Sequence, residues 1–244
     1  MSTRIALLAA VLVWATAPYA QDDSTTGPAE VSRYVDDTLI VREILDAVGW
    51  DTIPAAKVTK QADGRVVYLD LSNPSLLQEG IRTLPPKIGE LTGLRQLILN
   101  KNVLETLPAS LANLTDLEVL DLGDNELQAV PEWIGKLRNL RKLDLRNNEF
   151  GQLPPGLFAL ENLWYLHMWG NRLVTISEDL GKLENLKELY VERNRLTMLP
   201  KSITTMKSLE YIDYGYNKLC NLDPAVEAWL KKRDKKYRQL QKCW

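Results

Sequence analysis

Leucine and isoleucine residues recur along most of the chain at spacings of three and then two residues, and the positions between them are mostly polar. This alternation is the period-two pattern of a short strand with one buried face. The pattern repeats every 23 residues, in five consecutive units and the start of a sixth. The units begin at Leu94, Leu117, Leu140, Leu163, Leu186 and Leu209. The chain is therefore predicted to form a row of short parallel strands, one in each unit.

The ninth position of every unit is asparagine. The six residues are Asn102, Asn125, Asn148, Asn171, Asn194 and Asn217. Where a unit turns away from its strand, backbone donors and acceptors would be buried without partners, and an asparagine amide supplies both functions. We therefore predict that the asparagines form a structural ladder that bridges adjacent turns.

The second half of each unit is predicted to form the opposite side of the core. Its fifteenth position is proline in four units, at Pro108, Pro131, Pro154 and Pro200. Proline cannot donate to a strand ladder, so it is expected to redirect the chain around the outside. Apolar residues follow at the eighteenth and twenty-first positions. One unit cannot bury its own apolar side, so the units must stack to share one core.

The unit LxxLxLxxNxLxxLPxxIxxLxx resembles the leucine-rich repeat superfamily in its 23-residue form, over about residues 66–230. The resemblance implies an α/β fold, a right-handed horseshoe solenoid whose parallel sheet lines the concave side. The repeats are assigned to residues 66–222. Because this scaffold serves many partners, the resemblance does not decide what the protein binds.

Residues 36–65 are predicted to cover the first repeat. Asp36 or Asp37 can cap a helix over 38–48, and Gly49 ends it. The predicted apolar stripe of that helix is Leu39, Val41, Ile44, Leu45 and Val48. Two strands, over 57–62 and 65–71, flank a turn at Asp63 and Gly64 and are predicted to form a hairpin.

Residues 223–244 are predicted to cover the last repeat. A helix is expected to begin at Pro224 and to keep Val226 and Trp229 at the apolar repeat positions. Cys220 and Cys243 are the only cysteines, and in an exported chain a disulfide between them is the simplest interpretation, with two free thiols as the alternative. The whole arrangement resembles small secreted bacterial leucine-rich-repeat proteins.

The first 20 residues are interpreted as a targeting signal. They carry one positive charge, at Arg4, before an uncharged apolar run from Ile5 to Ala17. The run is short for a membrane span, and small residues follow it, as in a secretory signal peptide. We expect cleavage after Ala20, a flexible segment over 21–35 and an exported mature chain without a membrane span, secreted or held in the periplasm or cell envelope. An uncleaved anchor is the alternative.

Composition and charge weaken most enzymatic interpretations. The net charge of −2 argues against nucleic-acid binding, which needs a clustered basic excess. The single histidine, His167, excludes any site that needs two imidazoles, and two cysteines cannot form a zinc site with four cysteine ligands. His167 has no nucleophile on neighbouring outward positions. We predict a non-enzymatic protein with no cofactor and no metal, and the oligomeric state is left open.

The outward positions of the strands are the candidate binding surface. In the units beginning at Leu117 and Leu140 these positions are ordinary polar residues, including Asp121 and Asp144. This pair falls short of a calcium cage and is interpreted as solvated carboxylates. The next three units place tryptophan, tyrosine and the only histidine at the same positions. Nothing in the repeat core requires these rings.

Large rings on an outward face are typical of binding hot spots. We predict a protein or peptide site on the concave face, built from Tyr165, His167, Trp169, Tyr190 and Tyr211. One alternative is a carbohydrate-binding protein in which Trp169 and Tyr165 stack on sugar rings. Another is a structural or adhesive protein without a dedicated site, in which cross-strand ring pairs only stiffen the sheet.

Overall fold

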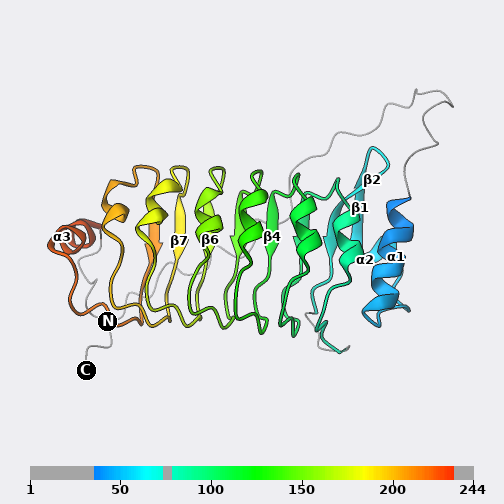
Figure 1. Ribbon diagram of the computed structural model, residues 1–244, viewed down its shortest axis with the longest axis horizontal. Coiled ribbons are helices and arrows are strands. Elements are labelled where there is room, and N and C mark those ends of the chain that lie inside the picture. Colours follow the sequence, from blue (N-terminus) through cyan, green and yellow to red (C-terminus); the bar gives the residue numbers. More distant parts are fainter. Residues whose placement is uncertain (1–35, 74–78, 234–244) are drawn as a thin grey trace, which may run out of the picture. The chain divides into compact units, whose positions relative to one another are not determined.

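The structure is a computed structural model, and it describes residues 36–73 and 79–233. Its centre is one sheet of eight strands in the order in which they occur along the chain (Figure 1). The strands are β1 (Thr59–Ala62), β2 (Arg65–Asp70), β3 (Gln96–Ile98), β4 (Val119–Asp121), β5 (Lys142–Asp144), β6 (Tyr165–His167), β7 (Glu188–Tyr190) and β8 (Tyr211–Asp213). All neighbours from β2 to β8 are parallel and pair in an unbroken register, as in Leu120↔Leu143 and Leu143↔Leu166. The predicted parallel sheet is confirmed.

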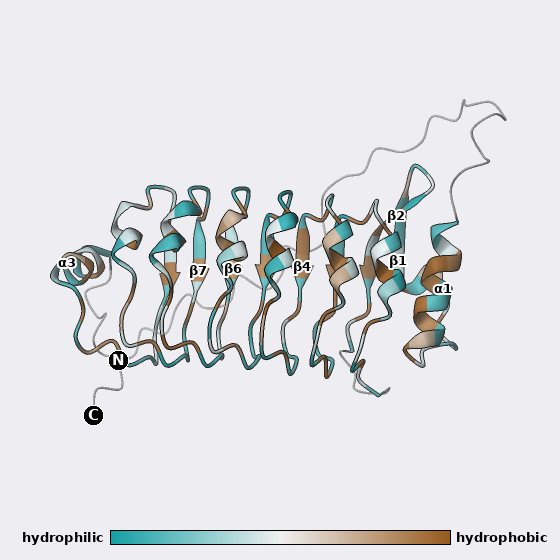
Figure 2. Ribbon diagram, viewed as in Figure 1, coloured by the Kyte–Doolittle hydropathy of each residue, from teal (hydrophilic) through white to brown (hydrophobic). Residues whose placement is uncertain are grey.

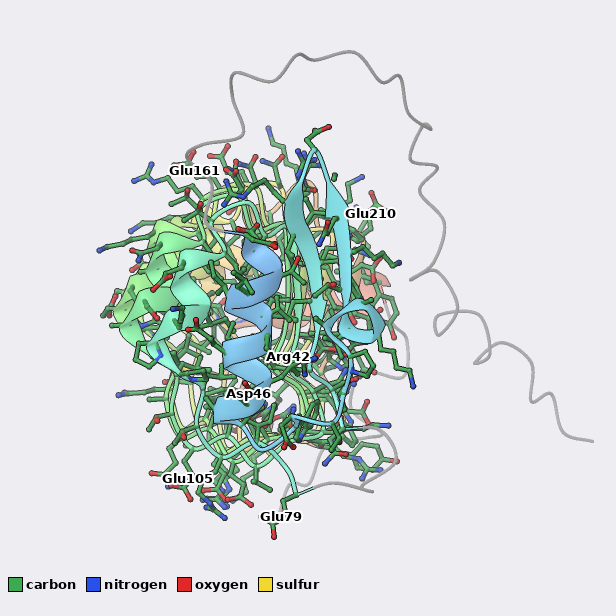
Figure 3. All side chains as sticks on the ribbon, turned by 90° about the vertical axis from the view of Figure 1, so that its right-hand side faces the viewer. Arg42, Asp46, Glu79, Glu105, Glu161 and Glu210 are labelled. Carbon is green, nitrogen blue, oxygen red and sulfur yellow. The ribbon has the colours of Figure 1, made fainter. Side chains whose placement is uncertain are left out.

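A layer of short 3-10 helices lies across the core from the sheet (Figure 3). They are η1 (Pro86–Glu90), η2 (Ala109–Asn113), η3 (Glu132–Lys136), η4 (Pro155–Ala159), η5 (Glu178–Lys182) and η6 (Lys201–Thr205). Each of the four prolines at the fifteenth position directly precedes one of these helices, and Ser177 replaces proline before η5, where its hydroxyl accepts from Asp179 N. Proline thus turns the chain into the second layer, as the sequence predicts.

The core lies between these two layers and is built from repeated columns of apolar side chains. In the unit that begins at Leu117, Leu120 and Leu122 enter it from the strand, while Ile134 and Leu137 enter it from the helical side. Figure 2 shows the alternation of apolar and polar residues along the turns. Because every unit repeats the columns, the core runs without interruption through the array.

The asparagine ladder is confirmed, and each amide both donates and accepts. The side-chain nitrogen of Asn148 donates to Leu122 O in the preceding unit at 2.9 Å and to Leu145 O in its own unit at 3.3 Å. Its side-chain oxygen accepts from Leu127 N at 3.0 Å. The same pattern recurs in the other units, for example at Asn194. The ladder therefore satisfies the backbone groups that each turn leaves inside.

A second row of asparagines lies at the last position of three units. The side-chain nitrogens of Asn139, Asn162 and Asn185 donate to the backbone oxygens of Thr115, Arg138 and Glu161, at 2.9, 2.9 and 2.8 Å. These exposed residues join adjacent units where the chain enters the strands. The pattern was present in the sequence but was not part of the predicted ladder.

At the amino-terminal side of the repeats, α1 (Asp37–Ala47) lies across the end of the stack (Figure 3). Asp36 caps the helix by accepting from Thr38 N, and Gly49 follows it with φ 77°. The predicted stripe is partly wrong, because Leu39 is 59% exposed and Ile40 is buried instead. One full turn of helix separates Ile40 from Ile44, which places both on the buried face.

The predicted hairpin follows α1 and a short helix, α2 (Ala55–Val58). Strands β1 and β2 are antiparallel around Asp63 and Gly64, whose φ angles are 51° and 72°. Two successive positive φ values are what a two-residue hairpin turn requires. The buried carboxylate of Asp37 accepts from Arg65 Nε at 2.9 Å and from Val66 N at 2.8 Å, and so fixes α1 to the first residues of β2.

At the carboxyl-terminal side, α3 (Pro224–Arg233) begins where the sequence predicts. Its buried residues are Val226 and Leu230, while Trp229 is partly buried with the Arg233 guanidinium 3.9 Å from its ring centroid. The signal peptide, the segment 21–35, Cys243 and the rest of the final segment lie outside the described residues. The bridge from Cys220 to Cys243 stays a prediction. Among the helices that the structure describes, none combines the length and apolar character needed to cross a bilayer.

Candidate functional site

Four of the five predicted binding residues lie on the outward face of the three strands β6, β7 and β8. Tyr165 and His167 flank the fully buried Leu166, so their side chains leave the sheet on the side away from the core. The register places His167 beside Tyr190, and Tyr165 and Tyr211 on either side of Glu188. The structure thus puts rings from three strands on one face.

Four of the five predicted residues form one continuous group, which we call the aromatic strip: Tyr165, His167, Tyr190 and Tyr211. Tyr190 is its centre, with ring centroids 5.5 Å from Tyr165, 4.9 Å from His167 and 5.2 Å from Tyr211. These separations fall in the range of favourable ring pairs. Tyr211 is 49% exposed, so the strip presents apolar ring surface to solvent.

Trp169, the fifth predicted residue, lies in a different environment, in the turn that follows β6. The Arg193 guanidinium lies 5.4 Å from the ring centroid of Trp169 and 5.5 Å from that of Tyr216. One arginine therefore holds two rings in a cation–π stack. Arg193 and Tyr216 were not among the predicted site residues, although both occupy outward position eight of their units.

The hydroxyl groups of Tyr165 and Tyr190 contact polar side chains of the same face. Tyr190 OH donates to Glu188 Oε2 at 2.9 Å, and Tyr165 OH lies 3.2 Å from His167 Nδ1. Burial raises the pKa of both tyrosines above its ordinary value, with further contributions from nearby carboxylates. Both hydroxyls therefore stay protonated at neutral pH, and the strip carries no charge of its own from its tyrosines.

Beside the strip, two buried carboxylates on β4 and β5 belong to a network of ionic groups whose other members are partly exposed. Asp121 and Asp144 are only 3% and 2% exposed, so the interpretation as solvated carboxylates is wrong. The Arg146 guanidinium pairs with Asp144 and lies 3.4 Å from Asp124. Asp121 accepts from Gly123 N and from the Asn100 amide. Burial, and then the charge of Asp144, raise the pKa of Asp121.

The network reaches the strip through His167, whose Nδ1 lies 3.4 Å from Asp144 Oδ2. The carboxylates thus orient a histidine and an arginine. In the described part of the chain, no three His, Cys, Asp or Glu residues lie close enough together to hold a metal ion. The carboxylates of Asp121 and Asp144 interact with protein donors: Asp121 with Gly123 N and the Asn100 amide, and Asp144 with Arg146.

Two further carboxyl groups, those of Glu192 and Asp213, interact with each other near Trp169. Burial raises the pKa of Glu192, and a hydrogen bond and the charge of Asp213 raise it further. The same group interacts with the side chains of Arg193 and Trp169. Glu192 therefore belongs to the group around Trp169 and Arg193, while Asp213 pairs in register with Tyr190 of the strip. Sequence reasoning placed it only among the polar neighbours, because a column pattern does not show which side chains touch.

Comparisons with known proteins agree with this architecture. Residues 117–226 match the model of a leucine-rich repeat region. A leucine-rich-repeat protein of Leptospira interrogans is 34% identical with a TM-score of 0.57, and the match covers 59% of this chain and 37% of that one. A plant ice-binding protein is 25% identical with a TM-score of 0.65, covering 77% of this chain and 64% of the other.

A third similar structure is the leucine-rich-repeat ectodomain of the Arabidopsis thaliana membrane receptor kinase GASSHO1/SCHENGEN3, in complex with CASPARIAN STRIP INTEGRITY FACTOR 2. It is 35% identical with a TM-score of 0.53, and the match covers 57% of this chain and 17% of that one. The chain thus spans less than two thirds of the length of each of these proteins. No curated protein matches its sequence.

Proposed function

The chain belongs to the leucine-rich repeat superfamily, and from this premise we propose that it is a non-enzymatic recognition scaffold that binds a protein or peptide on the outward face of its sheet. The observation that carries the proposal is the aromatic strip, because the core does not need it. Its rings pack on one another above the sheet, yet Tyr211 keeps about half of its surface exposed. Exposed aromatic surface of this kind is where partners gain most binding energy.

Charged groups lie around the strip. The Asp144 carboxylate, which pairs with Arg146, lies 3.4 Å from His167 of the strip, and Arg193 lies on the ring of Trp169. An interface core of rings with a charged rim is the usual arrangement of a specific protein complex. A leucine-rich-repeat ectodomain of similar fold has been solved with a bound factor, which supports a polypeptide partner for this scaffold.

The alternative is that the ring pairs only stiffen the sheet. The test uses the protein as bait, with Tyr190→Ala and Tyr211→Ala as variants. Tyr68→Ala is the matched control, since Tyr68 occupies the same position of its strand as Tyr165 and Tyr211, at the other end of the same face. We expect the two strip variants to lose the partners that the wild type and the Tyr68 variant retain.

A lowered melting temperature with unchanged partners would support stiffening alone. The melting temperature of each variant therefore has to be measured beside its binding. Truncation of the exposed Tyr211 is the cleaner of the two changes, because it has a ring contact only with Tyr190 among the described residues.

We also propose that the chain is exported, with residues 1–20 removed and Cys220 bridged to Cys243. The support is the charge and length of the apolar run and the presence of two cysteines in the last part of the chain. Amino-terminal sequencing of the recovered protein tests the cleavage. Its mass before and after reduction and alkylation tests the bridge.

A further inference from the structure

A hollow separate from the aromatic strip lies where the chain enters β5, β6 and β7. Its volume is about 430 Å³, and it is lined by Arg141, Asn162, Trp164, Asn185 and Lys187. This volume lies in the range of small-molecule sites, about 300–1,000 Å³. The lining contains a ring, two amides and two cations, and no carboxylate.

The repeat sets the order of these groups. Arg141, Trp164 and Lys187 occupy the second position of three successive units, directly before residues that pair in register as Lys142↔Tyr165↔Glu188. Parallel strands lie about 4.8 Å apart, so the backbones of Arg141 and Lys187 lie on either side of that of Trp164, one strand spacing away in each direction.

The two amides are fixed by the second asparagine row. The side-chain nitrogens of Asn162 and Asn185 donate to Arg138 O and Glu161 O, at 2.9 and 2.8 Å. Each amide plane is thereby held, and the amide oxygen is the atom left to accept a hydrogen bond from a ligand. The hollow therefore offers two preoriented acceptors one repeat apart.

The cations are available to a ligand. Arg141 Nε lies 3.7 Å from Glu118 Oε2, and Lys187 Nζ lies 3.7 Å from Glu210 Oε1. All four side chains are exposed, and solvent screens such long pairs strongly. A third cation, Lys142, lies 4.6 Å from the ring centroid of Trp164 and adds positive charge beside the hollow.

From these groups we propose that the hollow binds an acidic sugar, a hexuronate unit of an oligosaccharide. The C–H face of the pyranose lies on Trp164, its carboxylate pairs with Arg141, the carboxylate of an adjoining unit reaches Lys187, and its hydroxyls donate to the amide oxygens of Asn162 and Asn185. Each group of the lining then has a ligand group of matching chemistry. An acidic peptide would use the cations, but it has no row of hydroxyls to match the two amides.

This inference does not depend on the proposed protein-binding function, because none of its residues belongs to the aromatic strip. The test is titration calorimetry of the protein with tetragalacturonate and tetraglucuronate. Their methyl esters keep the ring and the hydroxyls but lack the charge. Tetraglutamate keeps the charge but lacks the ring.

We expect at least one uronate to bind, and its methyl ester to bind about tenfold more weakly or not at all. Trp164→Ala and Arg141→Ala should each weaken uronate binding by about tenfold. Arg95→Ala is the matched control, because Arg95 has the same position in its unit and also faces Glu118, but does not line the hollow. It should change the affinity by less than about twofold.

Three results would overturn the proposal. The first is that neither uronate binds. The second is equal binding of ester and acid, or equal losses in the Arg95 and Arg141 variants, since either would show that no localised carboxylate site exists. The third is tetraglutamate binding as tightly as the uronates, which would assign the hollow to acidic peptides. Because Trp164 also contacts Tyr165, the Arg141 variant decides the outcome if the tryptophan variant fails to fold.

Discussion

Strands β4 and β5 and strands β6 to β8 share one backbone and carry opposite kinds of outward surface. Each is a three-residue strand with an apolar residue in the middle, buried in β4 to β7 and partly buried in β8, and an asparagine at the same distance after it. On β4 and β5 the outward groups are the buried carboxylates of Asp121 and Asp144, with Arg146. On β6 to β8 they are mostly rings, with the carboxyl groups of Glu188 and Asp213 between them. The repeat thus decides where an outward side chain lies, and the residue at that place alone decides the chemistry of the surface.

Because both groups of strands have the same backbone and the same asparagine ladder, loss of one ladder asparagine should destabilise either group equally. We expect Asn148→Ala and Asn194→Ala each to lower the free energy of unfolding by about 3 kcal/mol, because each leaves buried backbone groups without partners. Both amides are buried and donate to carbonyls of two units. Urea unfolding followed by circular dichroism measures the loss. A loss in one half only would mean that the ladder does not act uniformly.

The ionic surface is expected to respond more than the aromatic one when an arginine is removed. Arg146→Ala leaves Asp144 buried without its cation, and we expect a loss of about 2 kcal/mol after allowance for the partial exposure of Arg146. Arg193→Ala is the control, because Arg193 is exposed and lies on rings. Its effect on urea unfolding should be well under half as large. If both variants lose the same unfolding free energy, the ionic and the aromatic surfaces do not differ in how much they depend on an arginine.

The aromatic surface is expected to respond in binding more than in stability. Tyr190→Ala removes three ring contacts from a partly exposed site, so we expect a loss of about 1 kcal/mol in unfolding free energy. Partner affinity should fall by about tenfold or more. A double-mutant cycle with Tyr165 separates the ring pair from the other contacts. If the two substitutions are coupled in unfolding free energy but neither changes the affinity for the partner, the strip has no binding role.

The smallest expected effect concerns Glu192 and depends on pH. Burial, and then Asp213, raise the pKa of Glu192, so its ionised form is less favourable in the folded chain than in the unfolded chain. Its charge therefore destabilises the fold at neutral pH, and this penalty disappears as the pH falls and the group is protonated. Glu192→Gln should raise the melting temperature by about 1 °C at pH 7 and leave it unchanged near pH 4. A difference that grows in acid would contradict the assignment.

Much of the fold follows from the sequence because its signals are periodic and local. The leucine columns, Asn102 to Asn217 and the prolines each act within one unit and its neighbour, so their spacing is sufficient to predict their role. The buried face of α1 was harder to predict. This helix has apolar residues on two sides, Leu39 and Ile40 among them, and its sequence does not show which side contacts the first repeat. Only the packing of α1 on β2 and η1 decides it.

The candidate site was predictable in position but not in contacts. The outward columns placed all five predicted rings on one face, yet Trp169 pairs with Arg193 rather than with Tyr190. The burial of Asp121 and Asp144 was also missed, because residues two positions apart, such as Asp144 and Arg146, cover one another only after the chain turns at the end of the strand. Such coverage depends on rotamers and neighbours that a repeat pattern does not encode.

The unbroken register of the parallel strands also makes the chain modular in length. Excision of residues 117–139 would join Asp116 to Leu140 and keep every column in phase, so that Asn148 would take the place of Asn125 beneath the preceding turn. The tyrosine-bearing strands would move about 4.8 Å closer to α1 with their own surroundings preserved. Gene duplication or loss in steps of one unit can therefore adjust the reach between the amino-terminal helix and the ring-bearing strands without redesign of either.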